Sequence, residues 1–112
     1  MKQIDFLRDF SLSLPEVKEE PHFDKTSFRV NKKIFVTYDA TLNRACFKSS
    51  ESDQDLFSLI DPSVIYPVPN KWGRQGWTNL EMDRLENEIL QDVLVSAYSE
   101  VAPKKLIELI KR

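Results

Sequence analysis

The stretch Thr26–Lys48, TSFRVNKKIFVTYDATLNRACFK, decides the expected fold because its side chains alternate in character with a period of two. Three short runs rich in β-branched and aromatic residues are separated by turn-forming residues, first at Asn31-Lys32 and then between Asp39 and Asn43. Such runs are typical of strands, and the short connections between them suit antiparallel neighbours. The stretch therefore predicts a three-stranded antiparallel meander.

The register of the first hairpin stays open at this point. A three-residue loop would pair Phe28 with Val36, whereas a two-residue loop would pair Phe28 with Phe35. Alternation along the strands also predicts which side chains share the sheet face away from the helices, namely Arg29, Lys33, Phe35, Arg44 and Lys48.

Helices are predicted on both sides of the meander. Residues 2–13 place apolar side chains three to four positions apart, and Pro15 ends that helix. After a polar connector at residues 16–21 and the meander, Ser50 is the expected N-cap of a short helix with an apolar edge of Leu56, Leu59 and Ile60. Residues 83–101 carry the widest apolar stripe in the chain, and Pro103 is expected to start a last short helix.

Two further strands are predicted between the helices. Residues 64–69 are extended, but their prolines restrict them to an edge of the sheet, and residues 77–80 form one more strand. The whole chain, residues 1–112, is thus expected to be a single α+β domain. Its predicted architecture is a two-layer sandwich, an antiparallel sheet of about five strands with helices packed on one face.

Composition restricts the classes of function. Cys46 is the only cysteine of the 112 residues, so an internal disulfide is impossible and a structural zinc site is not expected. The two glycines are too few for a glycine-rich phosphate loop. Neither a signal peptide nor an apolar run of about 18 residues is visible, and we expect a cytoplasmic, monomeric protein without membrane association.

Charge is distributed unevenly along a chain whose net charge is only -2. Residues 21–50 hold six cationic and two acidic side chains, a net charge of +4. Residues 81–100 hold one cationic and six acidic side chains, a net charge of -5. Such polarity either orients a binding face or reflects solvated strand and helix surfaces.

Several short motifs, taken in order, resemble the MmcQ/YjbR family, whose members are commonly labelled predicted DNA-binding proteins. The matching segments cover nearly the whole chain: Leu14-Pro15, Glu19-Glu20-Pro21-His22-Phe23, Lys25, Ser27-Phe28-Arg29-Val30, Lys33-Ile34-Phe35, Lys71-Trp72-Gly73, Gly76-Trp77, Ser96, Tyr98, Val101-Ala102 and Lys104-Lys105-Leu106. The resemblance implies a fold similar to the bacterial frataxin CyaY, with helices on an antiparallel sheet. It supplies no catalytic residues.

Cationic side chains near exposed aromatics suit nucleic acid, because cations bind phosphates and aromatic rings stack on bases. We therefore expect a small non-enzymatic protein that binds DNA without a cofactor, through Lys25, Arg29, Lys32, Lys33, Arg44, Lys48, Lys71 and Arg74. Three side chains are candidates for stacking or partner contact: His22, Phe35 and Trp72. Of the two tryptophans, Trp72 and Trp77, one is expected in the core.

Other interpretations of the same residues stay open. His22 has no cysteine or second histidine with which to hold a metal, and it suits a structural role in which it hydrogen-bonds the backbone. Cys46 is interpreted as a small side chain that fills space in a strand. The alternative function is a protein-interaction or structural module that uses the Trp72–Trp77 loop and any uncovered face of the sheet. A weaker alternative is frataxin-like metal binding by acidic residues, namely Asp5, Asp9, Glu16, Glu19 and Glu20.

Overall fold

The computed structural model describes residues 3–110 and contains a six-stranded antiparallel sheet in the order β1-β2-β3-β4-β6-β5. The strands are β1 (Val17–His22), β2 (Lys25–Val30), β3 (Lys33–Asp39), β4 (Arg44–Lys48), β5 (Ile65–Pro67) and β6 (Trp77–Glu81). The helices are α1 (Gln3–Ser13), α2 (Glu51–Ile60), α3 (Lys71–Arg74), α4 (Asn87–Val101) and α5 (Lys104–Ile107), with 3-10 turns at Met82–Arg84 and Glu108–Ile110. No helix within residues 3–110 is long and apolar enough to cross a membrane.

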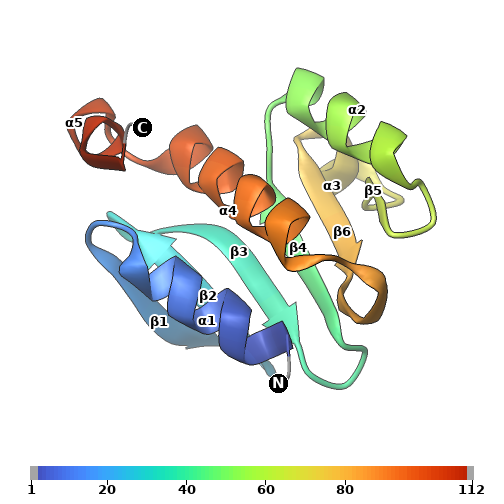
Figure 1. The fold of residues 1–112 in the computed structure, drawn as a ribbon, viewed down its shortest axis with the longest axis horizontal. Helices are drawn as coiled ribbons and strands as arrows, with labels where there is room; N and C mark the ends of the chain where they lie inside the picture. Colours follow the sequence, from blue (N-terminus) through green and yellow to red (C-terminus); the bar gives the residue numbers. More distant parts are fainter. Residues whose placement is uncertain (1–2, 111–112) are drawn as a thin grey trace.

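Helices α1 and α4 cover one face of the sheet (Figure 1). Helix α4 contacts β3 and β4, and its buried side chains are Leu90, Val93, Leu94, Ala97 and Tyr98. Burial of one large apolar side chain contributes about 1.5–3 kcal/mol, so this helix makes a substantial contribution to the stability of the core. Helix α1 contacts α4 and β1, and α2 lies beside β5. The α+β class, with helices on one face of an antiparallel sheet, is confirmed. We call the other face of the sheet the open face.

The sheet has six strands rather than about five, because the segment predicted as a polar connector forms β1. Val17 pairs with Val30 and His22 pairs with Lys25, so β1 runs along the whole of β2 at the edge of the sheet. An edge strand has one strand partner and tolerates charge, which also protects the edge from pairing with another chain. Arg8 of α1 donates to Glu19 of β1 at 3.0 Å and anchors the strand to the helix layer.

A β-bulge decides the register of the first hairpin. Asn31 and Lys32 both have positive φ (52° and 68°) and form the two-residue turn, yet Phe28 pairs with Val36. Both statements hold because the register shifts at Phe28/Arg29, where Arg29 pairs with Ile34 and Phe35 is the extra residue.

The bulge corrects the expected position of Phe35. Simple alternation placed this ring on the open face, whereas the extra residue turns it toward the helices, where it is fully buried. Its ring packs edge-on against Tyr98 of α4, with ring centroids 5.7 Å apart. Phe35 is therefore a core residue and cannot stack on a ligand.

Two of the predicted helices also differ in detail. Before α4, Leu85 adopts an extended backbone (φ -105°, ψ 129°) and buries its side chain, so the helix begins at Asn87 rather than at residue 83. In α2 the expected apolar edge is exposed, with Leu59 exposed by 78%, and the buried residue is Gln54. The Ser50 N-cap is confirmed, since its Oγ accepts from the Asp53 amide at 3.1 Å.

Candidate functional site

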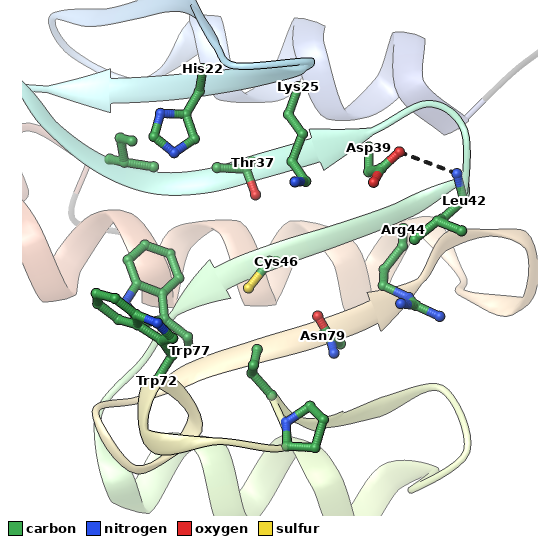
Figure 2. Close-up of a pocket in the computed structure, with 13 residues that line it drawn as sticks. His22, Lys25, Thr37, Asp39, Leu42, Arg44, Cys46, Trp72, Trp77 and Asn79 are labelled. Carbon is green, nitrogen blue, oxygen red and sulfur yellow. Dashed lines mark hydrogen bonds between the residues drawn. The ribbon is translucent and has the colours of Figure 1, made fainter.

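The open face carries a groove with a volume of about 580 Å³. Figure 2 shows that two tryptophans lie at one end of it, Asp39 and Arg44 lie at the other end, and His22 and Lys25 lie along one side. A volume of this size lies within the range of small-ligand pockets, which are mostly apolar with a few polar groups that set orientation. The groove is therefore the candidate functional site.

The floor of the groove is a row of uncharged side chains from three adjacent strands. Thr37 of β3 pairs with Cys46 of β4, and Cys46 pairs with Asn79 of β6, so the three side chains project from the same face. All three are half-buried. No hydrogen bond from the Thr37 hydroxyl or the Asn79 amide to another side chain or to the backbone is found among residues 3–110. These groups are free to donate to and accept from a ligand.

Cys46 lies in the middle of this floor but is not activated. Burial raises the pKa of its thiol from 9.0 to about 11, although a backbone hydrogen bond from Thr78 and the charge of Lys25 oppose the shift. The thiol is consequently protonated at neutral pH, and a protonated thiol is a poor nucleophile. Cys46 thus contributes shape and a weak hydrogen-bonding group to the floor.

The tryptophan end of the groove comes from a short turn between β5 and β6. Trp72 lies in α3 and is 51% exposed, and Trp77 is the first residue of β6 and is half-buried. Asn70 caps α3 by accepting a hydrogen bond from the Trp72 amide at 2.8 Å. Both rings line the groove, so the expectation that one of them belongs to the core is wrong.

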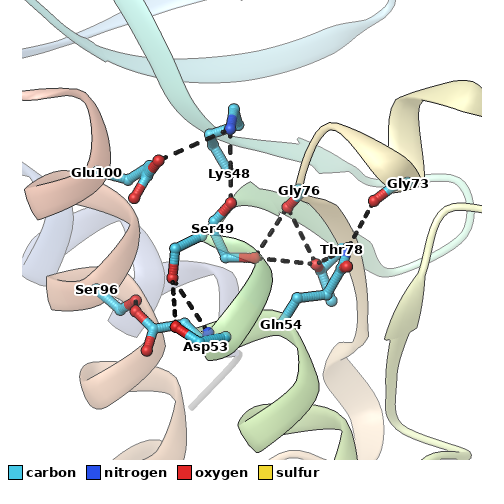
Figure 3. Close-up of polar contacts among 11 residues, drawn as sticks. Lys48, Ser49, Asp53, Gln54, Gly73, Gly76, Thr78, Ser96 and Glu100 are labelled. Atoms are coloured by element: carbon cyan, nitrogen blue, oxygen red, sulfur yellow. Dashed lines mark hydrogen bonds and ion pairs between the residues drawn. The ribbon is translucent and has the colours of Figure 1, made fainter.

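A buried polar network holds this turn against the helix layer (Figure 3). Gln54 of α2 donates from Nε2 to the Gly73 carbonyl at 2.8 Å and to the Thr78 hydroxyl at 3.1 Å. Ser49 donates through both its amide and its hydroxyl to the Gly76 carbonyl, each at 2.9 Å. The turn that carries Trp72 is therefore set in place without a ligand.

The only two glycines of the chain lie in this turn, and at each position a side chain would clash with the backbone. A Cβ on Gly73 would lie 2.0 Å from the Val68 carbonyl oxygen. A Cβ on Gly76 would lie 2.0 Å from the Ser49 carbonyl oxygen, and Gly76 also has a φ of +103°. Backbone segments approach here more closely than any side chain permits, which fixes the distance between α3 and the strands.

At the opposite end, Arg44 is held by an acidic partner. Its Nε donates to Glu81 Oε2 at 3.0 Å, and the Tyr66 hydroxyl donates to the same carboxylate oxygen. The hydrogen bond to Glu81 raises the pKa of Tyr66, so this hydroxyl remains a donor at neutral pH. Glu81 accepts from Nε, and the two terminal nitrogens of the Arg44 guanidinium make no hydrogen bond among residues 3–110. They can donate to an anion in the groove.

The hairpin between β1 and β2 forms the third side of the groove. His22 and Lys25 line it, and between them Phe23 is 92% exposed with a φ of 58°. A bulky residue with positive φ is uncommon and costs energy. The His22 ring contacts the Phe23 ring edge-on, with centroids 4.8 Å apart, rather than hydrogen-bonding the backbone of the described chain.

The eight predicted cationic residues do not form one patch. Lys25 and Arg44 line the groove, whereas Lys71 and Arg74 are exposed on α3 and Lys32 and Lys33 are exposed at the β2–β3 turn. The two others, Arg29 and Lys48, lie outside the groove and, like Lys25 and Arg44, have a carboxylate within 4.0 Å. Arg29 lies 3.9 Å from Glu20, and Lys48 lies 3.9 Å from Glu100 of α4, at the end of the sheet. Of the three aromatic candidates, His22 and Trp72 line the groove, and Phe35 does not.

Several groove residues were not singled out from the sequence, chiefly Thr37 and Asn79. The alternation along each strand could have identified them. Thr37 follows the core residue Val36 and Asn79 precedes the core residue Leu80, so both side chains project from the face of the sheet that is turned away from the core. The alternation shows which face a residue occupies. It does not show that the face is hollow.

The acidic residues considered for metal binding are dispersed. Within residues 3–110 no three histidine, cysteine or acidic side chains come together in a way that could hold a metal ion. Glu19 pairs with Arg8 at 3.0 Å, and Glu20 lies 3.9 Å from Arg29. Each of these carboxylates already has a cationic neighbour.

Comparison with known proteins agrees with the architecture. The chain is similar to the Deinococcus radiodurans protein DR2400, whose crystal structure carries a DUF419 domain, with a TM-score of 0.78 and 23% sequence identity. The superposition covers 94% of this chain and 82% of that one. A search of curated proteins finds no significant match. The YjbR family model matches residues 12–100, from the end of α1 nearly to the end of α4. The chain therefore belongs to the YjbR family.

Proposed function

We propose that this YjbR protein is a small non-enzymatic binding protein that takes a short unpaired segment of DNA in its open-face groove. The observation that carries the proposal is that Trp72, half-exposed and held in place, shares a groove with Trp77, Lys25 and Arg44. Aromatic rings give a stacking surface for bases, at about 1–3 kcal/mol per base, and cations attract the phosphates. The label commonly given to the family, DNA-binding, points in the same direction.

The distribution of charge favours an unpaired strand over a duplex. Binding to duplex DNA draws most of its free energy from many cations that neutralise phosphates. Here Lys25, Arg29, Arg44 and Lys48 each lie within 4.0 Å of a carboxylate, and the net charge of the chain is -2. Stacking on tryptophan does not depend on that charge, and unpaired bases are the ones that can stack.

A binding role without catalysis agrees with the chemistry of the groove. The Cys46 thiol, with a pKa of about 11, stays protonated. His22 contacts Phe23, and no carboxylate orients its ring among the described residues. A general base in an acyl- or phosphoryl-transfer site is normally oriented by such a third group.

Fluorescence anisotropy with a labelled single-stranded oligonucleotide, and with its duplex, tests the proposal. We expect the single strand to bind more tightly, with an affinity that falls as salt is raised. Trp72→Ala should weaken binding about tenfold, since one stacked base is lost. Lys25→Gln should also weaken it, whereas Lys32→Gln, the same change at a turn outside the groove, should not. Absence of binding at tens of micromolar protein would overturn the proposal.

A protein partner is the second candidate function, and the exposure of Phe23 favours it. This ring is 92% exposed beside a groove whose lining also includes Ile34, Leu42 and Val68. Exposed apolar side chains around a groove are typical of sites that receive a peptide. A pull-down that recovers one partner with the intact protein but not with Phe23→Ser, while DNA binding is absent, would favour this function instead.

A further inference from the structure

The groove has a direction, with stacking surface at one end and the guanidinium of Arg44 at the other. The carboxylates of Glu81 and Asp39 lie at this second end; Glu81 pairs with Arg44, and Asp39 Oδ1 accepts from the amides of Thr41 and Leu42. Along β6, Trp77 and Glu81 are four residues apart on the same face, and Glu81 pairs with Arg44. At about 3.3 Å per residue, the tryptophan end and the arginine end are separated by roughly 13 Å along the strand. The groove between these ends, at about 580 Å³, has room for a ligand the size of one nucleotide.

Between these ends the floor offers hydrogen bonds and no charge. Asn79 lies midway between Trp77 and Glu81 on β6, and its strand neighbour is Cys46. Its amide presents a donor and an acceptor side by side, the arrangement that pairs with the edge of a nucleobase. Thr37, beyond Cys46 on β3, adds a hydroxyl that both donates and accepts.

The arginine end is prepared for a phosphate. Glu81, which also accepts from the Tyr66 hydroxyl, holds the guanidinium by its Nε, and the two terminal nitrogens make no hydrogen bond among residues 3–110. Two parallel hydrogen bonds from a guanidinium are the strongest way in which a protein binds a phosphate group. Lys25, on the opposite side of the groove, adds a second positive charge.

We infer that the groove is a site for a single nucleotide. The base lies against Trp72 and Trp77 with its edge toward Asn79, and the phosphate is bound by Arg44 and Lys25. This inference rests on the proposed function, which it deepens by naming one nucleotide as the unit of recognition. Glu81 is then a positioning residue that acts through Arg44.

Isothermal titration calorimetry with the four deoxynucleoside monophosphates, the matching nucleosides and inorganic phosphate tests the inference. We expect a nucleotide to bind about tenfold more tightly than its nucleoside, because the nucleoside lacks the charged hydrogen bonds. Arg44→Gln should reduce that ratio to about one and leave nucleoside binding unchanged. Asn79→Ala should weaken the nucleotide and the nucleoside equally, and Lys32→Gln should change neither. Inorganic phosphate alone should bind weakly.

Each remaining outcome separates the two proposals. Equal affinity for nucleotide and nucleoside, or a ratio that survives both Arg44→Gln and Lys25→Gln, overturns the inference. Oligonucleotide binding without mononucleotide binding overturns the inference and leaves the proposed function standing. Mononucleotide binding without oligonucleotide binding overturns the proposed function and leaves the nucleotide site standing. Circular dichroism checks the fold of each variant, and Lys25→Gln provides the charge test if Arg44→Gln unfolds, since Lys25 is 39% exposed.

Discussion

Gln54 donates a hydrogen bond from Nε2 to the carbonyl oxygen of Gly73 at 2.8 Å, and this contact joins the helix layer to the turn that carries Trp72. The same nitrogen lies 3.1 Å from the Thr78 hydroxyl and 3.3 Å from the Trp77 carbonyl oxygen. One side chain of α2 therefore fixes residues on both sides of Gly76. The groove on the open face depends on a buried amide on the other side of the sheet.

Gln54→Leu keeps the approximate size of the side chain and leaves its buried partners unsatisfied. We expect a loss of about 2 kcal/mol in the free energy of unfolding, the usual cost of buried polar groups that lose their hydrogen bonds. Urea unfolding followed by far-ultraviolet circular dichroism measures this. Gln91→Leu, on the exposed side of α4, is the control and should change the stability by less than about 0.5 kcal/mol. Equal effects of the two changes would show that the network does not stabilise the turn.

Gly76→Ala should be more damaging than its size suggests. The new Cβ would lie 2.0 Å from a carbonyl oxygen, and the backbone φ of +103° disfavours every residue with a side chain. We expect a loss of at least about 2 kcal/mol, or failure to fold. Gln75→Ala, one residue earlier and exposed, is the matched control. Thermal unfolding measures both variants, and we expect a lower unfolding temperature for Gly76→Ala alone. Two unfolding temperatures close to that of the parent protein would contradict the prediction.

Phe35→Ala tests the bulge. If Phe35 faces the core against Tyr98, its removal leaves a cavity and costs about 4 kcal/mol. If simple alternation held and the ring lay on the open face, the loss would be small. Leu59→Ala, at a position exposed by 78%, shows the effect of removing an apolar side chain that the fold does not bury. Chemical denaturation compares the two variants.

The thiol of Cys46 makes stability depend on pH in alkaline solution. Its pKa rises from 9.0 in the unfolded chain to about 11 in the folded protein, so folding favours the protonated form. This contribution is fully present below pH 9 and is lost as the pH rises from about 9 to about 11. The tyrosines titrate in the same range, and the quantity to measure is thus the difference in unfolding free energy between the parent protein and Cys46→Ala. A difference that stays constant from pH 8 to pH 11 would contradict the raised pKa.

Local chemistry was sufficient to predict the meander. Asn31-Lys32 adopts positive φ at both positions, and the alternation on either side of it specifies the strands. It was insufficient for β1, because Lys18, Glu19 and Glu20 resemble a solvated connector. Only pairing with β2 at the edge of the sheet makes that segment a strand.

The candidate site was predicted in part. Trp72, His22, Lys25 and Arg44 were among the expected contacts and line the groove. Arg29 and Lys48 have the same charge and strand setting but lie outside the groove, and Arg29 pairs with Glu20 and Lys48 with Glu100. Arg44, which lines the groove, pairs with Glu81, 37 positions away in the chain. The charge of a residue is visible in a sequence, whereas its ion-pair partner is not.

The sequence by itself determined the class of fold and the family, because the alternation of side chains, the turn residues and the wide apolar stripe before Pro103 are local properties that any fold of this chain must satisfy. The tertiary structure alone decided where the groove lies and which side chains line it. A bulge buried Phe35, and a hydrogen bond from Gln54, 19 positions before Gly73, set the tryptophan turn beside the open face. Contacts between residues distant in the chain depend on the register and packing of whole elements, and no local pattern specifies them.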